Sequence, residues 1–128
     1  MNYSEFNEFC EALPATTYVI QWGGAHVWKV GGKVFAIGGW ADERPAFTFK
    51  TDRAQFEMLS QLPGVRPAPY LASRGMTWLQ EYQDPGLKDA HLRALLKESH
   101  RVVSLGLTKK LQRELGLNQD DAKRPSRG

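Results

Sequence analysis

Cysteine is nearly missing from this sequence: Cys10 is the single one among 128 residues, which excludes a fold held together by internal disulfides. Apolar runs are short as well, and none approaches the roughly 18 residues needed to cross a membrane as a helix. The first residues, Met1 to Glu5, show no positive region followed by an apolar one, so no secretory signal is expected. These absences predict a cytoplasmic protein that does not enter a membrane.

Motifs for catalysis and for cofactor binding are also lacking. His26, His91 and His100 share no metal-ligand spacing with one another or with Cys10. The glycine-rich stretch GGKVFAIGG (31–39) falls between predicted hairpins and not at a strand-to-helix turn, where a phosphate-binding loop would lie. We therefore expect a protein that is not an enzyme and that holds no cofactor and no metal.

Charge is unevenly distributed along the chain. The net charge is +3, and the isoelectric point is about 9.1. From residue 109 onward there are six basic and three acidic residues, so residues 1–108 are neutral as a whole. Within this neutral part, residues 29–74 hold seven basic and four acidic residues, which places any basic surface there. The basic end is either a solvated tail or an arm that seeks phosphates.

Hydrophobic periodicity and turn residues predict alternating elements along the chain. Asn2 followed by Glu5 has the spacing of a capping box at the start of a helix, and the glycine pairs at 23–24 and 31–32 indicate hairpin turns. Asp89 is the predicted N-cap of the longest helix. Helices are predicted over 3–13, 52–62, 89–105 and 108–115, and strands over 16–22, 25–30, 33–40, 46–51 and 76–82.

The order of these elements predicts an α+β fold. Strands follow one another without the alternation of strand and helix that builds a parallel sheet, so we expect a two-layer domain with an antiparallel sheet of about five strands and helices packed on it. The expected domain covers residues 1–115, and residues 116–128 are expected to form a basic, disordered tail. The proline-rich stretch 64–75 is interpreted as a stiff crossover, with Tyr70 and Leu71 pinned to the core.

Three blocks of the sequence resemble the MmcQ/YjbR family. They are HVWKVGGKVFAIGGWADERPAFTFKTD (26–52), PGVRPAPYLASRGMTWLQ (63–80) and LKDAHLRALLKESHRVVSLGLTKK (87–110). The resemblance covers about residues 3 to 115 and implies an α+β domain with an antiparallel sheet. It departs from the family at 73–76, where Asn and Lys are frequent before a Trp, and at His100, where a Tyr is frequent.

The resemblance also implies a function. Members of the family are commonly described as DNA-binding because paired β-hairpins have been likened to a double-wing motif. On this chain the wings would be the hairpin around Gly31 and Gly32 and the turn from Asp42 to Pro45. The nucleic-acid-binding residues expected on this basis are Lys29, Lys33, Arg44, Lys50, Arg66 and Arg74.

A second hypothesis remains open from the sequence. The domain would bind a protein partner or a small ligand in a cleft between the sheet, the loop 64–75 and the long helix. The neutral body of the chain favours this reading, whereas the positive charge of residues 29–74 favours DNA. A monomer is the favoured expectation for the oligomeric state.

Overall fold

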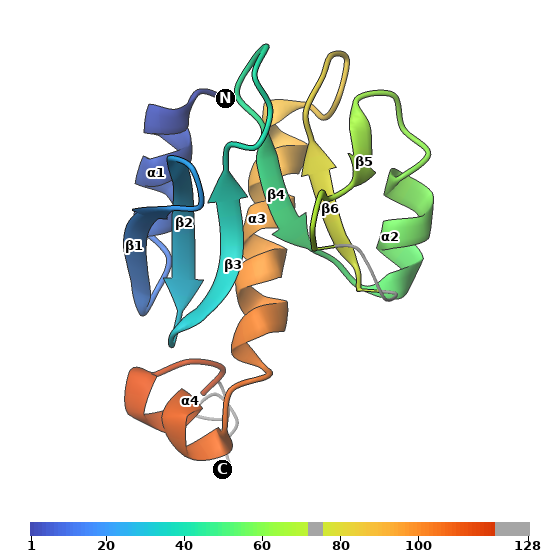
Figure 1. Cartoon of the computed structure of the whole chain (residues 1–128). Helices are drawn as coiled ribbons and strands as arrows, with labels where there is room; N and C mark the ends of the chain where they lie inside the picture. The colour runs from blue at the N-terminus through green and yellow to red at the C-terminus, as the bar shows by residue number, and fades with distance from the viewer. Residues whose placement is uncertain (72–75, 120–128) are drawn as a thin grey trace.

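The computed structural model describes residues 1–71 and 76–119, and it has the α+β architecture expected from the sequence (Figure 1). A single antiparallel sheet forms one layer, and helices pack on it. The helices are α1 (Tyr3–Glu11), α2 (Arg53–Leu59), α3 (Asp89–Ser104) and α4 (Lys109–Leu115). The strands are β1 (Thr16–Gln21), β2 (Ala25–Val30), β3 (Lys33–Gly38), β4 (Phe47–Lys50), β5 (Val65–Pro67) and β6 (Trp78–Glu81).

The sheet has six strands in the order β1-β2-β3-β4-β6-β5, and every neighbouring pair is antiparallel. Strands β1 to β4 form the expected meander, which the glycine turns make possible. The extra strand is β5, which lies inside the stretch that we predicted to be a plain crossover and pairs Val65 with Glu81. Gly64 permits this entry because its φ is +87° and a Cβ there would lie 1.9 Å from the Gln83 carbonyl oxygen.

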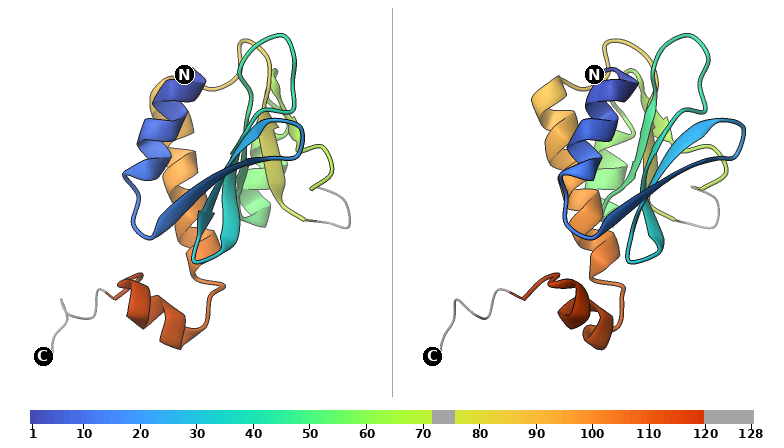
Figure 2. Two further views of the ribbon diagram at one scale, coloured as in Figure 1. Left: turned by 60° about the vertical axis from the view of Figure 1, so that its left-hand side comes forward. Right: turned by 90° about the vertical axis from the view of Figure 1, so that its left-hand side faces the viewer.

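The main core lies between the sheet and the two helices that cover one of its faces, α1 and α3 (Figure 2). Phe35, Phe47 and Phe49 point from the strands to this side and are fully buried. Leu92 and Leu96 of α3 meet them. Since side chains alternate along a strand, every second residue points to the opposite face, which we call the helix-free face.

The helix-free face has its own small apolar cluster. Ala25, Val27 and Ile37 are buried there, and Val34, Trp40 and Leu71 pack against them. The segment that follows β5 crosses this face, as the side views of Figure 2 show. One side of the sheet is thus closed by long helices and the other only by loops.

Local sequence signals set the helix starts. Asn2 accepts from the Glu5 amide at 2.8 Å, and the Glu5 carboxylate accepts from the Asn2 amide at 2.9 Å, which confirms the predicted capping box. The prediction for α3 was wrong by one residue: the N-cap is Lys88, and Asp89 is the first helical residue. The Asp89 carboxylate instead pairs with the amino terminus at 3.1 Å, and this contact holds its pKa below the usual range.

The C-terminal part of the described chain packs on the end of α3. Leu117 belongs to the main core, and the Asn118 amide donates to Ser104 at 3.0 Å and to Gln112 at 2.9 Å. Residues 120–128 of the predicted tail lie outside the described residues. The packed structure therefore includes residues 116–119, and a shortened chain should retain them.

Cys10 provides a test of the core. It is fully buried on α1, and burial raises the pKa of its thiol far above the ordinary value. We expect a thiol-specific reagent at pH 8 to modify the native protein at least about a hundredfold more slowly than the protein in guanidinium, because the thiolate is the reactive form. Equal rates in the two conditions would contradict the packing of α1 described above.

Candidate functional site

Five of the six residues expected to bind nucleic acid lie in the described part of the chain, and these five do not come together at one place. Neighbouring residues of a strand point to opposite faces of the sheet. The residues directly before Lys29, Lys50 and Arg66 belong to the main core, so these three side chains point to the helix-free face. Lys33 points the other way, and its Nζ donates to the Gly106 carbonyl at 3.3 Å beyond the end of α3. Arg74 lies outside the described residues.

The two expected wings are also separated. The turn at Gly31 and Gly32 precedes β3, whereas the loop 39–46 follows it, so the two lie at opposite ends of that strand (Figure 1). The neighbour of loop 39–46 is instead the β1–β2 turn, since a Cβ on Gly39 would lie 3.3 Å from Ala25. This paired end of the sheet carries Trp22 and Trp40 rather than lysines.

Arg44 is engaged by carboxylates. Its guanidinium lies 3.1 Å from Glu81 Oε1 and 3.6 Å from the Asp84 carboxylate. The Glu81 side chain is only 5% exposed, and its other oxygen accepts from the Leu87 amide at 2.8 Å. Arg44 therefore fastens loop 39–46 to the end of β6, and its charge is neutralised within the protein.

Arg66 is held in a different way. Its guanidinium lies over the ring of Tyr82, 4.0 Å from the centroid, and its Nε donates to Gln80 Oε1 at 2.8 Å. Gln80 is fully buried, and its amide nitrogen donates to the carbonyls of Gly39 and Trp40 at 3.2 and 3.4 Å. Through this one side chain, the position of Arg66 is linked to the backbone of Trp40.

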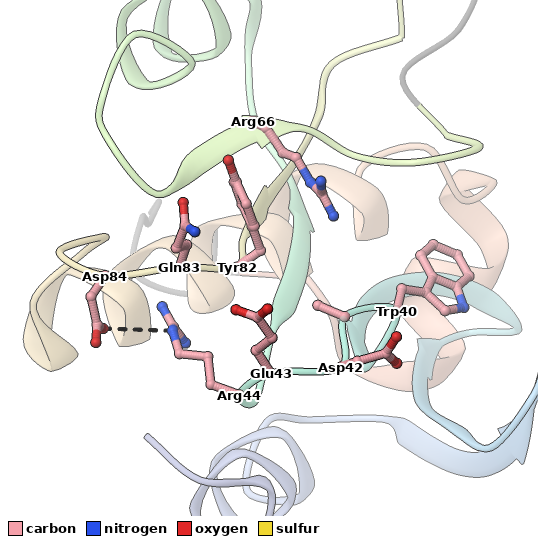
Figure 3. Close-up of a pocket in the computed structure, with 9 residues that line it drawn as sticks. Trp40, Asp42, Glu43, Arg44, Arg66, Tyr82, Gln83 and Asp84 are labelled. Atoms are coloured by element: carbon pink, nitrogen blue, oxygen red, sulfur yellow. Dashed lines mark ion pairs between the residues drawn. The ribbon is translucent and has the colours of Figure 1, made fainter.

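A polar hollow of about 610 Å³ opens between loop 39–46, β5 and the residues after β6 (Figure 3). Arg66 and Tyr82 point into it from one side, and Glu43 points toward it from the opposite loop. Its lining residues are Trp40, Ala41, Asp42, Glu43, Arg44, Arg66, Tyr82, Gln83 and Asp84. With Arg44 paired, Arg66 supplies the positive group, and Asp42 and Glu43 limit how strongly an anion is attracted.

An apolar hollow of about 430 Å³ adjoins the polar one and shares Trp40 with it. Trp22, Tyr70 and Leu71 complete its lining. Leu71 packs against the small apolar cluster of the sheet, but the expectation that Tyr70 also pins this stretch to the core was wrong, because its side chain is 82% exposed. The left-handed backbone at Tyr70, with a φ of 69°, turns the ring away from the core.

The cleft of the second hypothesis does not form among the described residues. It required the loop 64–75 to face the long helix, but Leu71 packs on the helix-free face whereas α3 packs on the opposite face. Both views of Figure 2 place the sheet between the two segments. A ligand at this loop would meet Trp22 and Trp40 instead.

Among residues 1–71 and 76–119, no three His, Cys, Asp or Glu side chains gather as a metal site would require. Nor does any helix there combine the length and the apolar composition needed to cross a membrane.

The residues that organise the site were not evident from the sequence. Gln80 and Glu81 are polar residues of the strand predicted over 76–82, and both are buried. The partners of Gln80 lie 14 to 41 residues away along the chain, and Arg44 lies 37 residues before Glu81, so no local spacing marks these pairs. Only Trp40 was marked by a local pattern, because it is a bulky aromatic that directly follows two glycines at the end of a predicted strand.

The fold defines the class of the protein as an α+β domain with a helix-covered antiparallel sheet. The YjbR family model matches residues 11–102, and the chain belongs to this family. The Deinococcus radiodurans protein DR2400, with a domain described as DUF419, superposes with a TM-score of 0.80 at 23% identity over 91% of this chain and 88% of that one. A Pseudomonas syringae protein gives a TM-score of 0.64 at 16% identity over 80% of this chain and 98% of its own. No curated protein matches the sequence.

Proposed function

We propose that this chain binds nucleic acid, and DNA in particular, through the helix-free face of its sheet. The observation that carries the proposal is the alternation that points Lys29, Lys50 and Arg66 to that face, which has exposed aromatic side chains at one of its ends. Lys29 and Lys50 belong to strands that are two positions apart, which corresponds to about 10 Å across the sheet. Cations combined with exposed rings form the usual surface for a nucleic-acid backbone.

The proposal differs from a grip by paired basic hairpins. Lys33 and Arg44 have contacts elsewhere in the protein, and the hairpins that carry them lie at opposite ends of β3. The flat face between the strand ends, rather than the turns, carries the remaining cations. With three phosphate contacts and two carboxylates nearby, binding is expected to be weak and largely independent of sequence.

The test is a set of charge-removing variants. We expect replacement of Lys29, Lys50 and Arg66 together by glutamine to weaken the binding of a labelled DNA by about tenfold at 50 mM salt, because three phosphate contacts are lost. The matched control replaces Lys88, Lys97 and Lys109, which are exposed on or beside α3 and α4, by glutamine. Fluorescence anisotropy measures both sets.

Equal weakening by the two sets would mean that net charge alone attracts DNA, and the helix-free face would lose its role. Absence of DNA binding at 50 mM salt by the unmodified chain would end the proposal. The basic residues of the tail are tested separately by replacing Lys123, Arg124 and Arg127 with glutamine in the full chain. If binding disappears with these three charges, the function lies outside the fold.

A further inference from the structure

Three aromatic side chains, the exposed Trp22 and Tyr70 and the half-buried Trp40, form one continuous surface at the end of the helix-free face. The ring centroids of Trp22 and Trp40 are 5.8 Å apart, and those of Trp40 and Tyr70 are 5.4 Å apart. Trp22 is 49% exposed and Tyr70 is 82% exposed. We call these three residues the aromatic shelf. Exposed rings gathered in this way mark a binding surface more often than scattered ones do.

The backbone holds all three rings in an unusual way. Trp22, Trp40 and Tyr70 have φ values of 54°, 69° and 69°, in the left-handed region that bulky residues rarely adopt. In the part of the chain that the structure describes, two other non-glycine residues have positive φ, namely Ala15 and Asn118. Backbone strain concentrated at one exposed cluster indicates that the cluster has a function, because folding alone gains nothing from it.

The shelf adjoins a positive group. Trp40 lines both the apolar hollow and the polar hollow into which Arg66 points (Figure 3). Gln80 connects the two residues, since it accepts from Arg66 and donates to the Trp40 carbonyl. A ligand lying across both hollows would therefore place a flat ring system on the shelf and an anionic group at Arg66.

A ligand that also reaches Lys29 must be longer than one flat ring system with one anionic group. Lys29 pairs with Val34, and Gly38 at the shelf end of β3 lies four residues further, about 13 Å along the strand. A chain of repeating ring and phosphate units satisfies both requirements. A cage for a single cation fits less well, because the hollow that the three rings of the shelf line with Leu71 has no acidic side chain to balance a positive charge.

We propose that the aromatic shelf stacks the unpaired bases of a single-stranded nucleic acid, with Arg66 at a neighbouring phosphate. Bases within a duplex already stack on their neighbours, so they offer no free face to the shelf, whereas every unpaired base does. The chain therefore prefers single strands to duplexes. This inference rests on the proposed function and adds the form of nucleic acid that the same face selects.

The test compares a labelled twelve-residue oligo(dT) with a labelled twelve-base-pair duplex at 50 mM salt, using the full chain. We expect the single strand to bind at least about tenfold more tightly than the duplex. Trp22→Leu combined with Tyr70→Leu should weaken single-strand binding by about 5- to 100-fold and duplex binding far less, because a duplex offers no free base face to the rings. The matched control is Tyr18→Leu, an exposed aromatic of β1 that contacts Trp28 outside the shelf.

The outcomes separate this inference from the proposed function. Equal binding of both forms, with no effect of the Trp22 and Tyr70 variant, would overturn the shelf inference and leave binding by the cations intact. Competition by free dTMP as strong as by the oligonucleotide, at equal nucleotide concentration, would overturn the assignment to a strand. Failure of both forms to bind would overturn both proposals. Melting temperatures of the variants verify that the fold is retained.

Discussion

Replacement of Glu81 by leucine is expected to lower the free energy of unfolding by about 2–4 kcal/mol. The Glu81 side chain is 5% exposed and satisfies two groups, the Arg44 guanidinium at 3.1 Å and the Leu87 amide at 2.8 Å. Leucine accepts neither hydrogen bond, so it leaves a half-buried positive charge and a buried amide without an acceptor. Urea unfolding followed by circular dichroism measures the change.

Asp84 is the matched control for Glu81, since it pairs with the same guanidinium at 3.6 Å but is 91% exposed. Asp84→Ala should change the stability by less than about 1 kcal/mol, as exposed ion pairs contribute little. Similar losses of stability for the two variants would contradict the explanation that Glu81 contributes more because it is buried. Glu81→Gln retains an acceptor for Leu87 and is expected to lie between them.

Replacement of Gln80 by leucine is expected to reduce both stability and binding. Three hydrogen bonds disappear, which leaves the Gly39 and Trp40 carbonyls and the Arg66 Nε without their partner. We expect a loss of about 2–4 kcal/mol in stability, because buried polar groups lose their hydrogen bonds. Nucleic-acid affinity should fall by about tenfold, since Arg66 and Trp40 lose the link that positions them together.

Thr48 provides the control for Gln80. It lies directly across from Gln80 on the same face and is also fully buried, and its hydroxyl has no hydrogen-bond partner among the described residues. Thr48→Val should be neutral or slightly stabilising, because it removes an unsatisfied group without changing the shape. If Gln80→Leu weakens stability but leaves affinity unchanged, Gln80 supports the fold without positioning the site.

Much of the fold follows from local sequence signals. The capping box of Asn2 and Glu5 and the hairpin turns at paired glycines depend on neighbouring residues, so their positions are predictable. Strand β5 was missed because it is three residues long, ends in Pro67 and exists only through pairing with β6. A pairing between Val65 and Glu81 leaves no periodic trace in so short a segment.

Less of the candidate site could be predicted from the sequence. Lys29 and Lys50 could be identified as basic residues of strands, and Arg66 as a basic residue of the predicted crossover, but whether such a side chain faces a helix or a free surface depends on the register of the sheet. Arg44 looked available because its partner Glu81 lies 37 residues further along the chain. The shelf combines three distant rings whose backbone conformations bulky residues rarely adopt, so propensity gives no indication of it.

The four tryptophan indole N–H signals provide the most direct test of the central claim, that the helix-free face binds nucleic acid. In a ¹⁵N NMR titration with oligo(dT), the signals of Trp22 and Trp40 should shift progressively with added oligonucleotide. The signal of Trp28 should remain in place, because its Nε1 donates to Asn7 on the helix-covered side at 2.9 Å. Shifts confined to residues of α3 and α4, with Trp22 and Trp40 unchanged, would contradict the account.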